Sequence, residues 1–147
     1  MSAAQNYFDE AEGFEFNGDY EKAVTHYQKA TEEDPVFVHA YNGWGNALLK
    51  LNRLPEARQK YEKCLELDAT YQWALYNLGK SYEGVDIVKA ATYYEKATKA
   101  EPLYADAFNA WGNSLLDQGK KEEAIEKYHK CLEIDTDYLW ALYNLGR

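Results

Sequence analysis

The segment Tyr41-Asn-Gly-Trp-Gly-Asn-Ala-Leu-Leu49 returns later in the chain as Phe108-Asn-Ala-Trp-Gly-Asn-Ser-Leu-Leu116. The two copies begin 67 residues apart (108 − 41 = 67), and aligning residues 41–80 with residues 108–147 gives 23 identities in 40 positions. Similarity at a fixed period over such a long segment indicates that a large unit has been duplicated. Internal repetition is therefore the property from which the fold is inferred.

Each large unit divides again into two smaller ones. Alanines at the start of an apolar stripe recur at intervals of 34, 33 and 34 residues, at Ala23, Ala57, Ala90 and Ala124. Apolar residues then follow every three or four positions, as in Ala23, Tyr27 and Ala30, which is the spacing of one buried face of a helix. A period of this length accommodates two helices and a tight turn. The sequence therefore predicts an all-helical fold of antiparallel hairpins.

Turn residues separate the two helices of each predicted hairpin. The turns are Asn17-Gly18-Asp19, Leu51-Asn52-Arg53, Gly84-Val85-Asp86 and Gln118-Gly119-Lys120. We expect their glycines to adopt the positive φ that ends a helix with little strain. Small residues such as Gly45 and Ala57 are expected to let helices approach closely, with Tyr61 filling the space beside them.

Period and residue types together resemble the tetratricopeptide repeat (TPR), with its pattern W-x-x-L-G-x-x-Y, then A-x-x-x-F, then P. The third copy is the best match, through Leu78-Gly79, Tyr82, Ala90, Tyr94 and Pro102. The resemblance implies an all-α fold, a right-handed superhelical solenoid of helix-turn-helix repeats. We expect one array over residues 1–147, with repeats at about 4–37, 38–71, 72–104 and 105–138 and a further first helix at 139–147.

The charge of the chain argues against two classes of partner. The formal net charge is −9, whereas affinity for nucleic acid or an anionic membrane comes largely from clustered Lys and Arg. No apolar run approaches membrane-spanning length, and the first residues lack the basic and apolar regions of a secretory signal. We therefore expect a cytoplasmic protein that binds another protein, and neither nucleic acid nor a membrane.

The sequence contains no recognisable pattern for catalysis, for a cofactor or for a metal. Neither a Ser/His/Asp nor a Cys/His arrangement is present, and no Gly-rich loop could hold a phosphate. Cys64 and Cys131 occupy equivalent places in two copies without a nearby CxxC, so a packing role is expected for both. The prediction is a protein that is not an enzyme.

In proteins that resemble this chain, the first helices of successive repeats line a concave groove that holds a peptide or a helix. Helical spacing places one stripe of polar and aromatic residues on each such helix. The residues expected to line the groove are His39, Asn42, Asn46, Trp73, Tyr76, Asn77, Lys80, Asp106, Asn109, Asn113, Trp140, Tyr143 and Asn144, with Arg147 ending the last stripe. Asparagine amides both donate and accept, so this ladder is interpreted as a grip on a peptide backbone, with Trp and Tyr selecting apolar or basic side chains.

Two alternatives remain open from the sequence alone. The asparagines can instead hydrogen-bond between neighbouring helices, and Trp73 and Trp140 can pack between repeats. The array can also act as a scaffold or a homo-oligomer through its end faces, because Trp140, Leu142 and Leu145 make the last helix apolar. The asparagines and tryptophans are therefore expected either to contact a ligand or to pack between repeats, and the last helix either to line the groove or to contact another copy of the chain.

One known mechanism of the family fits the sequence poorly. Repeats that hold the acidic C-termini of heat-shock chaperones use a clamp of Lys, Arg and Asn side chains on two carboxylates. Asn46 and Asn77 fit the Asn roles, but the places of the cations are taken by Asn42, Asp106 and Ala110. Without those cations a carboxylate has little to pair with, so this clamp is not expected.

Overall fold

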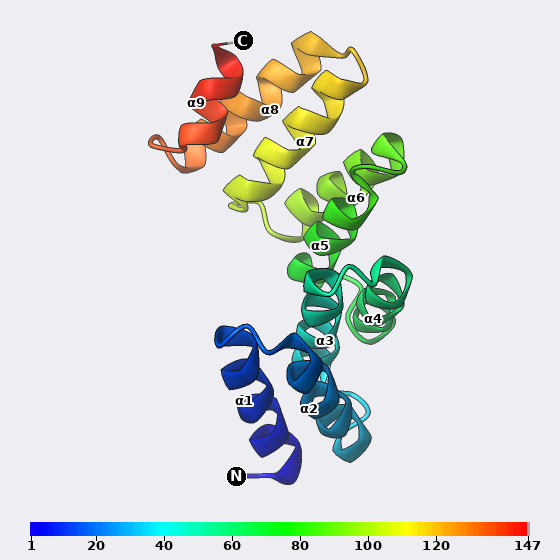
Figure 1. The fold of residues 1–147 in the computed structure, drawn as a ribbon. Coiled ribbons are helices and arrows are strands. Elements are labelled where there is room, and N and C mark those ends of the chain that lie inside the picture. Colours follow the sequence, from blue (N-terminus) through cyan, green and yellow to red (C-terminus); the bar gives the residue numbers. More distant parts are fainter. Residues whose placement is uncertain (147) are drawn as a thin grey trace. The chain divides into compact units, whose positions relative to one another are not determined.

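The structure is a computed structural model that describes residues 1–146, and α-helix is the only regular secondary structure in this range. The helices found there are α1 (Ala3–Phe16), α2 (Tyr20–Glu33), α3 (Val38–Lys50), α4 (Leu54–Leu67), α5 (Gln72–Tyr82), α6 (Ile87–Ala100), α7 (Ala105–Asp117), α8 (Lys121–Ile134) and α9 (Leu139–Leu145). They pack as sequential antiparallel pairs, from α1 with α2 to α7 with α8 (Figure 1). The predicted all-helical fold of hairpins is confirmed. Within residues 1–146, no helix has both the length and the apolar character needed to cross a membrane.

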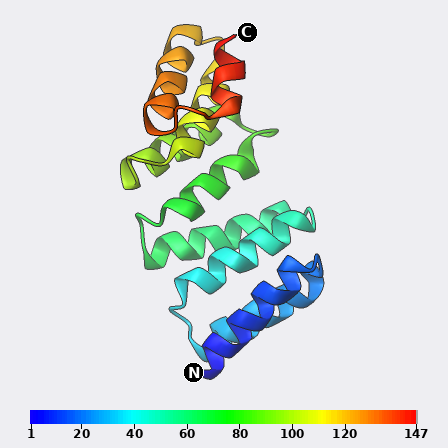
Figure 2. The same ribbon diagram turned by 90° about the vertical axis from the view of Figure 1, so that its left-hand side faces the viewer.

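The chain forms two compact units. The first, Met1–Ala69, holds α1 to α4, and α3 packs against both α2 and α4. The second, Thr70–Arg147, holds α5 to α9, and α7 packs against α6, α8 and α9. Figure 2 shows the same helices from a second direction. The single array and its repeat boundaries stay predictions, and Arg147 lies outside the described residues.

The turns between paired helices follow the prediction with one exception. Positive φ angles occur at Gly18 (79°), Asn52 (58°) and Gly119 (79°). Gly84 does not adopt a positive φ, so the prediction for this glycine is wrong. Helix α5 has 11 residues, two fewer than α3 or α7, and the connection that follows it closes instead with the N–H of Asp86 donating to the carbonyl of Tyr82 at 2.8 Å.

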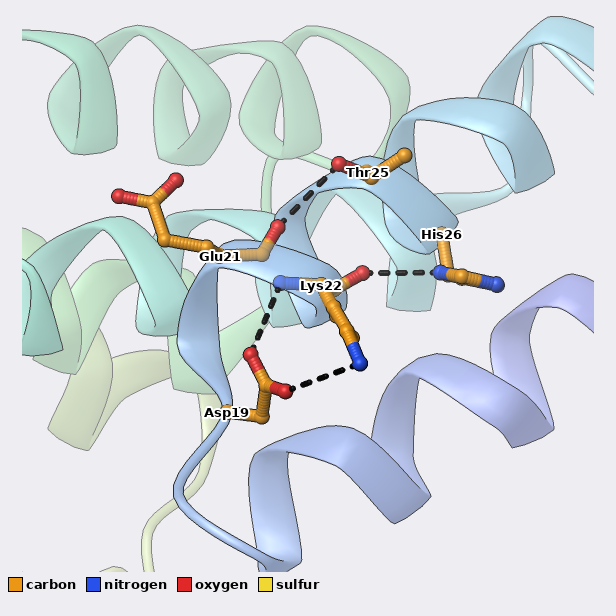
Figure 3. Close-up of polar contacts among 5 residues, drawn as sticks. All are labelled: Asp19, Glu21, Lys22, Thr25 and His26. Carbon is orange, nitrogen blue, oxygen red and sulfur yellow. Dashed lines mark hydrogen bonds and ion pairs between the residues drawn. The ribbon is translucent and has the colours of Figure 1, made fainter.

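The first turns of α2 show how polar side chains are held against their own helix (Figure 3). The Asp19 carboxylate caps the helix by accepting the Lys22 N–H at 3.4 Å, and it also pairs with Lys22 Nζ at 3.7 Å. Thr25 Oγ1 donates to the Glu21 carbonyl at 3.2 Å, and His26 Nδ1 lies 2.9 Å from the Lys22 carbonyl. His26 also contacts α1, since its ring lies 4.8 Å from that of Phe14 and its Nε2 lies 3.2 Å from Glu10 Oε2.

At the centre of the packing, tyrosine rings lie directly on glycine backbones. The pairs are Tyr27 with Gly43, Tyr61 with Gly45, Tyr94 with Gly79 and Tyr128 with Gly112. All four rings are at most 2% exposed. A Cβ atom added to any of these glycines would lie 2.5–2.7 Å from the nearest ring carbon, well inside van der Waals contact. Each glycine is thus needed for the close approach of its helix.

The hydroxyl groups of the same tyrosines all find an acceptor on a neighbouring segment. The acceptors are Glu15 Oε1 for Tyr27 (3.0 Å), Asn46 Oδ1 for Tyr61 (2.6 Å), Glu83 for Tyr94, and Asn113 Oδ1 for Tyr128 (2.6 Å). Carboxylate and amide acceptors alternate along the chain, in agreement with a duplication of two hairpins. Each buried ring therefore keeps its polar end hydrogen-bonded.

Both cysteines are free and buried, as their packing role requires. Burial raises the pKa of the Cys64 thiol to about 12 and that of the Cys131 thiol to about 11. The Cys64 thiol also donates to the Val38 carbonyl, with sulfur and oxygen 3.4 Å apart. Both thiols are therefore protonated at neutral pH and are poor nucleophiles.

The tyrosine-glycine packing makes a matched pair of glycine substitutions informative. Gly45→Ala is expected to lower the free energy of unfolding by about 2 kcal/mol, because its methyl group would lie 2.6 Å from Tyr61 Cε1. Gly13→Ala is the control, since nothing lies within 4 Å of its added Cβ, and helix propensity should stabilise it by about 0.5–1 kcal/mol. Urea denaturation measures both. Unchanged stability of Gly45→Ala would contradict the packing role.

The carboxylate under Tyr27 predicts a pH-dependent stability. Burial raises the pKa of Glu15 above 4.5, and the Tyr27 hydrogen bond opposes this shift only in part. The folded state then binds the proton more tightly than the unfolded state, so ionisation of Glu15 lowers stability as the pH rises above about 4.5. Glu15→Gln keeps an acceptor oxygen for Tyr27, and it should raise the Tm at pH 7 but not at pH 3.5. An equal effect at the two pH values would refute this assignment.

Candidate functional site

A cleft of about 330 Å³ opens in the second unit beside α7 and α9. Its lining, called here the asparagine cleft, consists of Glu83, Ile87, Asn109, Asn113, Ser114, Asp117, Trp140, Tyr143 and Asn144. Because α9 packs against both α7 and α8, its side chains meet those of α7. Five predicted groove residues are thereby brought together, namely Asn109, Asn113, Trp140, Tyr143 and Asn144.

Three asparagines of the cleft form one hydrogen-bond network. The amide Nδ2 of Asn144 donates to Asn113 Oδ1 at 2.9 Å and to Asn109 Oδ1 at 3.3 Å. Asn113 Oδ1 also accepts from the hydroxyl of Tyr128 on α8 at 2.6 Å. Bonding between neighbouring helices, the alternative left open by the sequence, is therefore present here. The network ties α7, α8 and α9 together through the amide oxygens.

The amino groups of two of these asparagines remain available to a ligand. Asn109 and Asn113 make their side-chain hydrogen bonds through Oδ1, and Nδ2 of each has no partner among residues 1–146. No buried side-chain nitrogen or oxygen in that range lacks a partner, so these two Nδ2 atoms must reach solvent. Asn109 is only 8% exposed, so little of this residue besides the unpartnered amino group needs to reach solvent. The cleft thus presents donors for carbonyl oxygens.

Aromatic rings form another wall of the cleft. Trp140 is 67% exposed and Tyr143 is 61% exposed, although both are large and partly apolar. Their ring centroids lie 6.4 Å apart with an interplanar angle of 89°. Both rings offer surface that a bound group could cover.

Two carboxylates in the lining were not predicted from the sequence. Asp117 lies one helical turn beyond Asn113, on the same stripe of α7, so extending the spacing i, i+4, i+8 from Asn109 would have found it. Glu83 follows α5 directly and accepts the hydroxyl of Tyr94, whose pKa burial raises above its ordinary value. Its place in the cleft depends on tertiary packing, for which the sequence carries no signal.

The other predicted residues of the second unit do not line this cleft. Trp73 is 46% exposed, with its ring 5.4 Å from that of Tyr71. Tyr76 packs on the rings of Tyr94 and Tyr104, and burial raises its pKa to about 12. Asn77 is partly buried on α5, while Lys80 is exposed on the same helix. Asp106 is exposed and accepts the hydroxyl of Tyr138.

In the first unit, the predicted residues lie along α3. His39 is exposed in the first turn of the helix, whereas Asn42 and Asn46 are partly buried. Asn46 Oδ1 accepts from Tyr61 at 2.6 Å, so this amide has the same internal role as Asn113. Of these three residues, Asn46 therefore has a structural function in addition to any contact with a ligand.

Each unit also has another cleft, in which lysine side chains already contact a ring or a carboxylate of the chain. In the first unit it measures about 460 Å³, with Lys60 Nζ 3.9 Å from the Trp44 ring centroid and Lys63 3.5 Å from Glu66. In the second unit it measures about 530 Å³, and Lys130 lies 3.6 Å from Glu133. Within residues 1–146, no group of three or more His, Cys, Asp or Glu side chains is placed to hold a metal ion. The asparagine cleft is therefore the best candidate site.

The amide network predicts a coupled loss of stability. Asn144→Ala should lower the free energy of unfolding by about 1–2 kcal/mol, because it removes the donor to two amide oxygens. In a double-mutant cycle, Asn113→Ala and Asn144→Ala should deviate from additivity by about 0.5–1 kcal/mol, measured by urea denaturation. Asn6→Ala is the control, since its side chain is exposed on α1. Strict additivity would show that the amides are not coupled.

Comparison with known proteins places these observations in a family. The sequence profile of the TPR repeat matches residues 17–52, 45–85 and 112–147. The chain is 33% identical over 132 residues to the probable UDP-N-acetylglucosamine-peptide N-acetylglucosaminyltransferase SPINDLY of Hordeum vulgare, covering 84% of this chain and 14% of that protein. It is 28% identical over 138 residues to Hsp70-Hsp90 organizing protein 3 of Arabidopsis thaliana, covering 88% of this chain and 22% of that protein. The chain thus spans less than a quarter of the length of these two relatives.

A solved structure shares the fold over most of the chain. The crystal structure of MamA superimposes with a TM-score of 0.81 and 26% sequence identity, covering 89% of this chain and 77% of that one. The similarity to the glycosyltransferase is confined to its TPR part. Since the repeat profile matches more than half of the residues, the chain belongs to the TPR repeat family.

Proposed function

We propose that this chain is a protein-interaction module that captures a peptide segment of a partner protein, with the asparagine cleft as one of its contact sites. TPR domains in general bind protein partners. The chain acts in this proposal by binding, and it carries out no chemical reaction. The observation that carries the proposal is the pair of accessible amide donors, on Asn109 and Asn113, beside two exposed aromatic rings.

The geometry of the cleft suits an extended segment better than a small polar molecule. An extended peptide exposes backbone carbonyls, and the Nδ2 groups of Asn109 and Asn113 are donors without a partner among residues 1–146. Their orientation is set in advance, because Tyr128 and Asn144 donate to the amide oxygen of Asn113 and Asn144 donates to that of Asn109. A preset donor costs little conformational entropy on binding. Trp140 then supplies apolar surface for a side chain of the segment.

The remaining predicted residues are proposed as further contacts within their own units. In the first unit these residues are His39, Asn42 and Asn46, and in the second they are Trp73, Tyr76, Asn77, Lys80 and Asp106. The exposed side chains among them are the better candidates, because Asn46 and Tyr76 already have internal packing or hydrogen-bonding roles.

A second candidate function rests on the exposed apolar surface of α9. Leu139 is 77% exposed and Leu142 is 48% exposed, in addition to the two aromatic rings of the cleft. In the alternative proposal this surface pairs with a second copy of the chain, and the protein acts as a scaffold. A molar mass that rises with concentration in light scattering, and that Leu142→Lys keeps at the monomer value, would favour this alternative.

Selection from a random linear peptide library against the immobilised chain tests the first proposal. The selected peptides, resynthesised, should bind the wild type, and Trp140→Ala should weaken them by about tenfold, since a contacting Trp is a typical hot spot. Phe16→Ala is the control, because Phe16 is 92% exposed and lies on α1. Isothermal calorimetry measures the affinities. Peptides that bind the Trp140→Ala variant unchanged would exclude the asparagine cleft as the binding site.

A further inference from the structure

The charged groups of the asparagine cleft are all of one sign. Glu83 and Asp117 belong to its lining, whereas no Lys, Arg or His among residues 1–146 does. Asp117 has no hydrogen bond or ion pair with any other described residue. Glu83 accepts the Tyr94 hydroxyl, a bond that leaves the negative charge of the carboxylate uncompensated. Carboxylates at the wall of a protein cleft focus a negative potential there, which attracts a cation.

The aromatic rings of the cleft favour the same kind of group. Elsewhere in this chain, lysines lie over tryptophan faces, with Lys60 Nζ 3.9 Å from the Trp44 centroid and Lys127 Nζ 4.1 Å from the Trp111 centroid. No lysine of residues 1–146 lies over Trp140, whose side chain is 67% exposed. An indole face attracts an ammonium or guanidinium group. Trp140 is therefore suited to hold a cation supplied from outside.

Asn109 provides an observation independent of charge. Asn109 lines the cleft and is more than nine-tenths buried, yet its Nδ2 has no partner in the described part of the chain and reaches solvent. Because this donor reaches solvent at the cleft, the backbone carbonyl of a bound peptide can replace water as its acceptor. A peptide residue anchored there by its carbonyl would have its side chain within the same small cleft as Asp117 and Trp140.

We propose that the asparagine cleft selects a basic residue, Lys or Arg, of an extended peptide segment, with its cationic side chain between the carboxylates of Glu83 and Asp117 and the face of Trp140. This inference rests on the proposed function, because it names the side chain that the same cleft admits. Acidic segments are excluded by the same charges, since a ligand carboxylate would meet two carboxylates and no cation.

The experiment uses the peptides selected from the random library and a pair of charge-neutral variants. The selected peptides whose affinity falls for the Trp140→Ala variant are assigned to the cleft, and these should be enriched in Lys or Arg at one position. Replacing that residue by its neutral analogue, Arg by citrulline or Lys by norleucine, should weaken binding to the wild type about tenfold. On the double variant Glu83→Gln/Asp117→Asn, the same replacement should change the affinity by less than about twofold.

A matched control keeps the interpretation specific. Glu126→Gln removes one negative charge from an exposed position on α8, outside the cleft, and should leave the tenfold preference intact. Gln at position 83 retains an oxygen for Tyr94, and Asp117 has no described partner to lose, so the double variant should unfold at the wild-type temperature.

The outcomes separate this inference from the function on which it depends. Peptides that lose affinity on Trp140→Ala but show no preference for Lys or Arg would overturn the charge selection and leave the interaction module standing. Peptides whose binding is indifferent to Trp140→Ala would overturn both proposals. A cationic preference that survives in Glu83→Gln/Asp117→Asn would overturn the assignment to these two carboxylates.

Discussion

The contact between a tyrosine ring and a glycine backbone sets the distance between helices in four packed pairs, α2 with α3, α3 with α4, α5 with α6 and α7 with α8. Because the ring of Tyr128 lies on Gly112, the hydroxyl at its far edge reaches one definite point on α7, which is the amide oxygen of Asn113. That bond turns the amide, and the oriented oxygen in turn receives Asn144 from α9. The arrangement of donors in the asparagine cleft is thus a consequence of core packing, transmitted through two hydrogen bonds.

Most of the fold follows from spacing that is visible in the sequence. The interval between Ala23 and Ala57 and the apolar stripes predict helical hairpins, because only helices bury residues three and four apart on one face. The identity of the packing partners is harder to obtain, yet Gly45 and Tyr61 were paired correctly by their sizes. The backbone conformation of Gly84 was predicted wrongly, because α5 ends earlier than α3 and α7 and the chain leaves it through a different turn.

The residues of the candidate site were predictable in part, because some of them follow a helical spacing and others are brought to the cleft only by tertiary packing. Asn109, Asn113 and Asn144 were found because their positions share a helical stripe. The hydrogen bonds that these amides make inside the protein depend on Tyr128, which belongs to a different helix. A local sequence pattern does not predict such contacts. Glu83 enters the lining only through tertiary packing. Sequence spacing therefore locates the side chains, whereas the direction of their donors requires the structure.

The alternation of acceptors under the tyrosine hydroxyls has a consequence for building longer versions of this protein. The acceptor precedes its tyrosine by 12 and 11 residues where it is a glutamate, and by 15 residues where it is an asparagine. Neighbouring hairpins therefore satisfy the same buried hydroxyl group with different acceptors, and the type of acceptor repeats only every second hairpin. The repeating unit of this chain is thus a pair of unlike hairpins, and an engineered array built by copying that pair would keep both kinds of buried hydroxyl bond in their native surroundings.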